Sequence, residues 1–215
     1  MDLALMERIA PYFVEAALVT LEVAALTFVF SVLIGAIATA GRMSRLTPVR
    51  WLATAYVSVF RGTPCLVQLF LIYFGGPQLG FDLTPFTAGV VGMSLNVGAY
   101  MAEAIRGAIL TVDRGQAEAA RSIGFGQGRT MVYVILPQAA RLMIRSIGVN
   151  TIMMVKGTSL VSAISVVELS YTAQRYIGST FKPFEIFALA AVLYIIIVYA
   201  VSRTVEMLDR RFALR

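Results

Sequence analysis

Long runs of apolar residues separated by short polar stretches dominate this chain. A bilayer core about 30 Å thick requires roughly 20 helical residues at 1.5 Å each. Five runs have about this length, and they cover residues 16–40, 52–74, 86–105, 138–167 and 184–201. They are unlike the alternating ten-residue strands of a membrane barrel, and open sheet edges cannot face lipid. The pattern therefore predicts an all-α integral membrane protein, with five transmembrane helices in one domain over residues 1–215.

Two of the runs are irregular. The run at 52–74 contains the letters RGTP, from Arg61 to Pro64. Proline and glycine interrupt helices, so we expect a helix near the cytoplasmic interface first and the crossing mainly after Pro64. The run at 138–167 is longer than a crossing requires and carries three basic residues, Arg141, Arg145 and Lys156.

Composition agrees with a membrane protein. Hydrophobic residues make up 59% of the chain, charged residues make up 14%, and the mean hydropathy is +0.80. A soluble domain is nearer half apolar and a quarter charged. The chain has no histidine and a single cysteine, Cys65, which excludes Cys/His zinc sites, histidine general bases and an intramolecular disulfide. The acidic Asp2 and Glu7 do not fit a secretory signal, so we expect the first apolar run to stay in the protein.

The basic residues between the runs predict the orientation. Arginines follow the first run and the third run, and four more lie in the C-terminal tail. The connection with the letters GGPQLGFDLTP has no basic residue, and the one before the last run has only Arg175 and Lys182. Cytoplasmic loops carry the excess of Lys and Arg. The bias predicts an N-terminus outside the cell and a C-terminus in the cytoplasm.

One polar stretch, GQAEAARSIGFGQGRT at 115–130, lies on the predicted cytoplasmic side. Residues 116–123 favour a helix of two turns, and Gly124 follows in the position of a helix C-cap. Glu118 in the first turn and Arg121 in the last suit the helix dipole. A short helix with small side chains suits docking into a groove of another protein. An amphipathic loop helix lying on lipid headgroups is the other interpretation, and the residue types alone leave both open.

The spacing of this stretch resembles a known motif. Glu-Ala-Ala, three residues, glycine, nine residues and then VILP resemble the cytoplasmic motif of ABC importer permeases. The resemblance implies a coupling helix within 111–130, between the third and fourth spans, that docks on an ATP-hydrolysing subunit. The coupling residues that it implies are Glu118, Ala119, Ala120, Arg121, Gly124 and Pro137. The stretches RGTPCLVQLFLIYFG, SLNVGAYMAEAIRGAI, ILPQAAR and KGTSLVSAISVVEL resemble the polar amino-acid subfamily, and PVRWLA, GPQLG and SIG are similar to its cystine and glutamine types.

This resemblance implies a permease subunit of the bacterial inner membrane that works in a complex. Its partners would be a second permease (identical or related), two ABC ATPases, an extracytoplasmic binding protein and an amino-acid substrate. The chain has no G-x-x-x-x-G-K-[ST] motif, so we expect ATP and magnesium on the ATPase, with no catalytic residue, metal or cofactor here. An ion-gradient-driven secondary transporter and a membrane scaffold are the two alternatives from other classes. The residues do not say which amino acid is carried.

Polar residues inside the runs are candidates for the substrate pathway, because charged groups at bilayer depth cost several kcal/mol unless paired or hydrated. An amino acid needs donors for its carboxylate and acceptors for its ammonium group. The candidates are Asn96, Glu103, Gln68, Asn150, Lys156 and Ser159. Pairing between helices is the alternative role for each. Gly157 stands where the resembling family usually has aspartate, and RLMIRSIGVN lacks the usual proline. Both differences lie near the expected translocation path, so they concern the identity of the substrate and not membership of the family.

Overall fold

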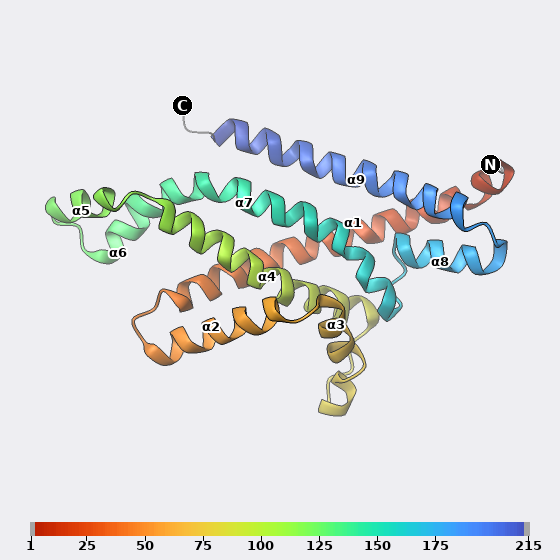
Figure 1. The fold of residues 1–215 in the computed structure, drawn as a ribbon, viewed down its shortest axis with the longest axis horizontal. Helices are drawn as coiled ribbons and strands as arrows, with labels where there is room; N and C mark the ends of the chain where they lie inside the picture. The colour runs from red at the N-terminus through yellow and green to blue at the C-terminus, as the bar shows by residue number, and fades with distance from the viewer. Residues whose placement is uncertain (1–2, 213–215) are drawn as a thin grey trace.

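The computed structural model describes residues 3–212, and within them it contains helices and no strand. Four long helices run side by side along the molecule (Figure 1). They are α1 Leu3–Arg42, α4 Pro85–Thr111, α7 Leu136–Gly157 and α9 Pro183–Phe212. A π-helical turn, η2 Met131–Ile135, leads into α7, and a 3₁₀ segment, η3 Thr158–Ile164, continues it.

Short helices lie at the two ends of this bundle. α5 Arg114–Ser122 and α6 Gln127–Thr130 connect α4 to η2 at one end, toward which α9 also finishes (Figure 1). α8 Leu169–Thr180 lies at the other end, beside the beginnings of α1 and α9. The start of α1 and the end of α9 are therefore at opposite ends of the molecule.

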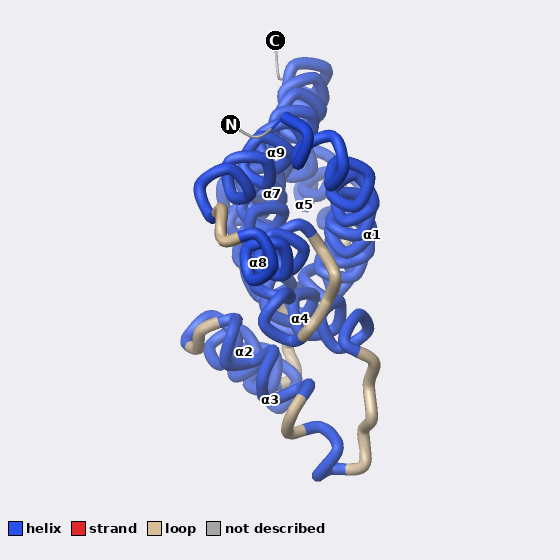
Figure 2. The backbone as a smooth tube through the Cα atoms, turned by 90° about the vertical axis from the view of Figure 1, so that its right-hand side faces the viewer, coloured by secondary structure: helices blue, strands red, loops and turns tan. Residues whose placement is uncertain are grey.

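A bent pair of helices packs against the side of the bundle (Figure 2). α2 Thr47–Gly62 and α3 Cys65–Tyr73 meet at 105° across the residues around Pro64, and η1 Gly76–Leu79 follows. Nine residues rise only about 13 Å, which is too little to cross a bilayer. The expected crossing mainly after Pro64 is therefore wrong, because α2 supplies more of the length.

Within residues 3–212, four helical segments are long and apolar enough to span a membrane, and the bent pair is a fifth candidate. They coincide with the five apolar runs. The helices exceed the runs, most clearly in α1 and α9, because both continue through flanking residues at 3–15 and 202–212 that include charged side chains. Hydropathy reports the apolar part of a helix and not its ends.

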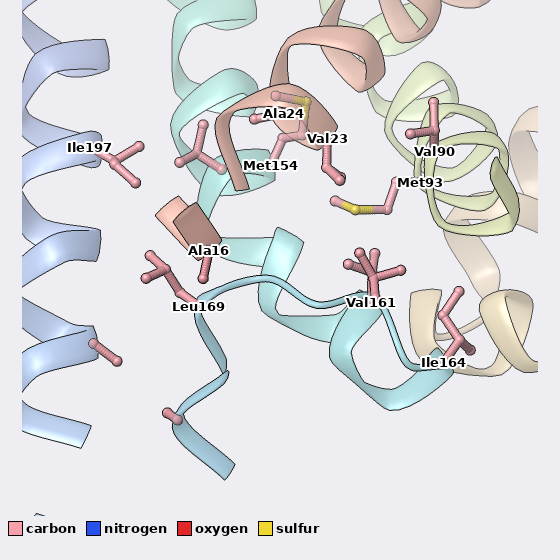
Figure 3. Close-up of a cluster of buried hydrophobic side chains, with 14 of the residues drawn as sticks. Ala16, Val23, Ala24, Val90, Met93, Met154, Val161, Ile164, Leu169 and Ile197 are labelled. Carbon is pink, nitrogen blue, oxygen red and sulfur yellow. The ribbon is translucent and has the colours of Figure 1, made fainter. Parts of the chain in front are cut away.

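The hydrophobic core joins α1, α4, α7, η3, α8 and α9, and Figure 3 labels side chains from all six. Glycines allow α1 and α4 to approach closely. A Cβ on Gly35 would lie 2.6 Å from the Cβ of Met101, and one on Gly98 would lie 2.8 Å from Ile34 Cγ2. Small residues are the usual means of close helix packing in membranes.

Candidate functional site

α5 is a well-bounded helix at one end of the bundle. Asp113 accepts a hydrogen bond from the Gly115 amide at 2.7 Å, which begins the helix two residues before the predicted start. At its other end the Gly124 amide donates to the Arg121 carbonyl, and the next amide donates to the Ala120 carbonyl, both at 3.0 Å. These two bonds form a Schellman motif, which requires a left-handed residue after the C-cap. Gly124 has a φ of +87°, as its predicted capping role demands.

Most of the predicted coupling residues face away from the bundle. The exposed members are Glu118, Ala119, Arg121, Gly124 and Pro137. Ile123 is 74% exposed, and a Cβ on Gly124 would meet no atom within 4 Å. Ala120 differs, because it is only 3% exposed and packs toward the bundle. It can hold α5 in place but cannot itself contact a docked protein.

α5 is also tied directly to the start of α7. Pro137 is the second residue of α7 and has no amide hydrogen, and the preceding turn widens into a π-helix with an i to i−5 bond from Leu136 to Met131. The Gln138 side-chain amide donates to the Val134 carbonyl at 2.9 Å and to Gln116 Oε1 at 3.2 Å. This hydrogen bond links α5 to a long helix of the bundle.

The break between α2 and α3 is closed by two side-chain amides. Gln68 Nε2 lies 3.0 Å from the Phe60 carbonyl, 3.1 Å from the Thr63 carbonyl and 2.6 Å from Thr63 Oγ1. Asn96 Nδ2 donates to the Phe60 carbonyl and to Gln68 Oε1, each at 3.0 Å. The last carbonyls of any helix lack partners within it, and these two side chains supply donors to them. Gln68 and Asn96, two of the predicted pathway residues, therefore donate hydrogen bonds to the backbone carbonyls at the break between α2 and α3.

A cavity of about 200 Å³ adjoins this break, between α3, α4 and α7. Its polar lining comes from Asn96, Tyr100 and Asn150, and the rest includes Cys65 and several methionines. The Asn150 amide group donates to the Ser146 carbonyl at 2.8 Å. Gly157 also lines the cavity, and a Cβ there would lie at an ordinary 3.7 Å from Met93 Cε. The lining carries amide and hydroxyl groups and no charged side chain.

Glu103 lies outside this cavity, in a cluster of arginines. It forms a hydrogen-bonded ion pair with Arg42, and its carboxylate lies 3.7 Å from Arg61 and 4.0 Å from Arg106. The cluster joins α1, α2 and α4. Arg61 also packs over the Tyr100 ring, with its Cζ 5.4 Å from the ring centroid. The geometry of Glu103 corresponds to pairing between helices, the alternative that the sequence left open.

Lys156 and Ser159 line a different groove, of about 620 Å³, between the end of α7 and α9. Tyr194, Tyr199 and Ser202 of α9 contribute its other polar groups. The six predicted pathway residues thus divide among a cavity, a helix break, an ion cluster and this groove. Asn96 and Asn150 share the cavity, and Lys156 and Ser159 share the groove.

The sequence as a whole matches a family model described as the binding-protein-dependent transport system inner membrane component, over residues 31–214. The chain belongs to this family. Among curated proteins, this transport component is 40% identical over 193 residues to the L-cystine transport system permease protein TcyB of Bacillus subtilis, covering 89% of this chain and 82% of that protein. It is 38% identical over 203 residues to the glutamine transport system permease protein GlnP of Escherichia coli, covering 94% and 93%.

Solved structures agree with the assignment. A chain from a structure titled as an amino acid ABC transporter with histidines superposes with a TM-score of 0.93 at 36% identity, covering 98% of this transport component and 99% of that chain. A chain of the inward-facing MetNI methionine ABC transporter superposes with a TM-score of 0.75 at 20% identity, covering 97% and 98%, which shows the fold alone. The resemblance drawn from the motifs is confirmed.

One buried carboxyl of this transport component escaped the sequence analysis. Glu168 is fully buried, accepts a 2.9 Å hydrogen bond from the Tyr171 amide as the N-cap of α8, and accepts a 2.5 Å bond from the Tyr194 hydroxyl. Burial raises its pKa above the ordinary value, while these hydrogen bonds oppose that rise. An acidic residue directly after a long apolar run, in the letters VVEL, was the available signal.

Proposed function

We propose that this chain is the transmembrane permease subunit of an ATP-driven importer of polar amino acids, with residues 1–215 acting as one permease domain. The observation that carries the proposal is α5. It is a capped, exposed helix beyond the end of the spans, and it is hydrogen-bonded to the start of α7. The relatives named as cystine and glutamine permeases support the class of substrate.

In the proposed complex, α5 docks into a cytoplasmic ABC ATPase through Glu118, Ala119, Arg121 and Gly124, while Ala120 holds the helix from behind. Helices that dock in grooves present a surface of this kind. ATP and magnesium bind on the ATPase, so the chain acts without a cofactor or catalytic site of its own. A second permease, two ATPases and an extracytoplasmic binding protein complete the complex in the bacterial inner membrane.

The orientation puts α5, α6 and the end of α9 in the cytoplasm, and the start of α1 outside. Two features support it. Arginine is concentrated in the loops at the α5 end, as cytoplasmic loops require. The start of α1 and the end of α9 also lie at opposite ends of the molecule, which an odd number of crossings demands (Figure 1).

The pathway passes the cavity lined by Asn96, Tyr100 and Asn150. Amides and a hydroxyl can bind the groups of an amino acid backbone and of an uncharged polar side chain. Gly157 leaves the lining without the carboxylate that a cationic side chain would require. This neutral lining favours cystine-type or glutamine-type substrates over basic ones. Closure of the ATPase dimer would push α5, and α7 would move with it between outward-facing and inward-facing states.

Reconstitution tests the proposal. Proteoliposomes that contain the chain with its co-expressed ATPase and binding protein are given labelled L-cystine, L-glutamine or L-arginine. We expect uptake of a neutral substrate that requires internal ATP, and none when a proton or sodium gradient replaces ATP. Uptake driven by the gradient alone would identify a secondary transporter. Binding of the ATPase without uptake of any amino acid would favour a scaffold.

A further inference from the structure

A further groove, similar in size to the one beside Lys156, lies outside every site considered above, and its lining is almost entirely apolar. It holds about 610 Å³ between α7 and α9, and Phe28 of α1 contributes to its lining. α7 and α9 touch beside it, because a Cβ on Gly148 would lie 2.2 Å from Val205 Cγ1. The groove follows the middle of α7, from Ala140 to Thr151.

The lining offers almost nothing for a polar ligand to bind. Its two polar side chains are threonines, and each hydroxyl is already used within its own helix. Thr151 donates to the Ile147 carbonyl at 2.8 Å, and Thr204 donates to the Ala200 carbonyl at 2.9 Å. An occupant of this groove must therefore be apolar, and the abundant apolar group in a bilayer is the lipid acyl chain.

Two arginines border the end of the groove nearer α5. Arg141 directly follows the lining residue Ala140, and Arg211 lies one turn beyond the lining residue Leu208. Both are exposed, and neither forms an ion pair with any residue in 3–212. Arg145, by contrast, is held by Asp209 at 3.0 Å. Basic pockets between transmembrane helices on the cytoplasmic side favour anionic lipid headgroups.

The groove also lies on a different face of α7 from the cavity proposed as the pathway. Gly148 lines the groove, and Gly157 lines the cavity with Asn96 and Asn150. Nine residues are about two and a half helical turns, so these glycines lie on opposite faces of α7. The groove therefore faces away from the proposed pathway.

We propose that this groove binds one acyl chain of an anionic phospholipid of the inner leaflet, with its phosphate held between Arg141 and Arg211. The site is separate from the proposed substrate pathway, and lipid binding to it does not require transport. It also adjoins α7, the helix that is tied to α5.

Native mass spectrometry of the full-length chain, purified in detergent, tests the site with phosphatidylglycerol and phosphatidylcholine added in competition. We expect the wild-type chain to retain phosphatidylglycerol preferentially. A juxtamembrane arginine near the surface contributes about fivefold in affinity for anionic lipid. Arg141→Ala and Arg211→Ala should each weaken phosphatidylglycerol binding by that amount and together abolish the preference. Arg50→Ala, which removes an exposed arginine elsewhere, is the matched control.

The apolar part is tested by filling the groove. Thr204→Trp should reduce the binding of both lipids, whereas Ile37→Trp, on an exposed face of α1, should not. Melting temperatures identify any variant that fails to fold, and Ala140→Trp then replaces it. Unchanged lipid binding in the groove variants would overturn the proposal. Equal retention of the two lipids by the wild type would overturn the anionic assignment. Loss of permease dimers on cross-linking, with lipid binding unchanged, would assign the groove to a second copy.

Discussion

The end of a helix leaves backbone carbonyls without partners inside the helix. Gln68 satisfies those of Phe60 and Thr63 at the break after α2. Gln68→Leu should therefore lower stability by about 1–3 kcal/mol for the polar groups left unpaired. The melting temperature of the purified chain measures this, and Gln78→Leu, the same change at an exposed position, is the control. Equal melting temperatures for the two variants would show that the break is satisfied in another way.

Glu103 and Asn150 were both predicted from the sequence as pathway residues. We expect substitution of Glu103 to affect stability and substitution of Asn150 to affect uptake. Glu103→Gln leaves three neighbouring arginines without their carboxylate, so we expect a lower melting temperature. Asn150→Ala removes an amide from the cavity wall, so we expect weaker uptake with the melting temperature unchanged. Uptake assays and thermal unfolding of both variants check this. An unchanged melting temperature in Glu103→Gln would return that residue to the pathway.

The sequence indicated that Asn96 and Glu103 are important, but it did not predict which side chains they contact. A polar residue in an apolar run indicates importance, whatever its role. Asn96 meets Gln68 across 28 positions, and Glu103 meets Arg42 across 61. No local pattern encodes such pairings, because they depend on how the helices pack. Asn96 and Glu103, seven residues apart on α4, accordingly have different neighbours.

At the scale of the element, α5 is the feature whose surface can be changed without disturbing the bundle. Glu118 is exposed, and reversing its charge should weaken ATPase docking, since like charges brought together at an interface cost several kcal/mol. We expect Glu118→Lys to reduce co-purification of the ATPase about tenfold or more. Glu206→Lys, an equal charge change on α9, should leave it unchanged. Equal recovery from both variants would contradict docking through α5.

The end of α5 depends on one backbone conformation. Gly124 has a φ of +87°, whereas Gly126 has a φ of −69°, and a Cβ at either would meet no atom within 4 Å. Gly124→Val should therefore cost about 1–2 kcal/mol of strain that Gly126→Val does not. Hydrogen exchange at the α5 amides measures the difference, and Gly124→Asn should restore much of the protection. Equal exchange in both valine variants would mean that the cap does not hold α5.

Elements were predictable where their signal is local. The glycine that closes α5 and the apolar centres of the spans follow from residue types alone. The division of the crossing around Pro64 could not be predicted, because a proline marks a break in a helix without indicating which side carries more of the crossing. The burial of Ala120 was missed for a related reason, since the side of a short helix that faces the bundle depends on tertiary packing.

At the scale of the whole molecule, the orientation across the membrane leads to the last prediction. Because Cys65 is the sole cysteine, Cys65→Ala gives a cysteine-free background. Leu79→Cys, at a position 77% exposed beyond α3, should react with a membrane-impermeant maleimide in intact spheroplasts. Gly126→Cys, between α5 and α6, should react only after permeabilisation, because the positive-inside bias puts this loop in the cytoplasm. The cysteine-free chain controls for background labelling. The reverse pattern would invert the topology, and it would remove α5 from the reach of any cytoplasmic ATPase.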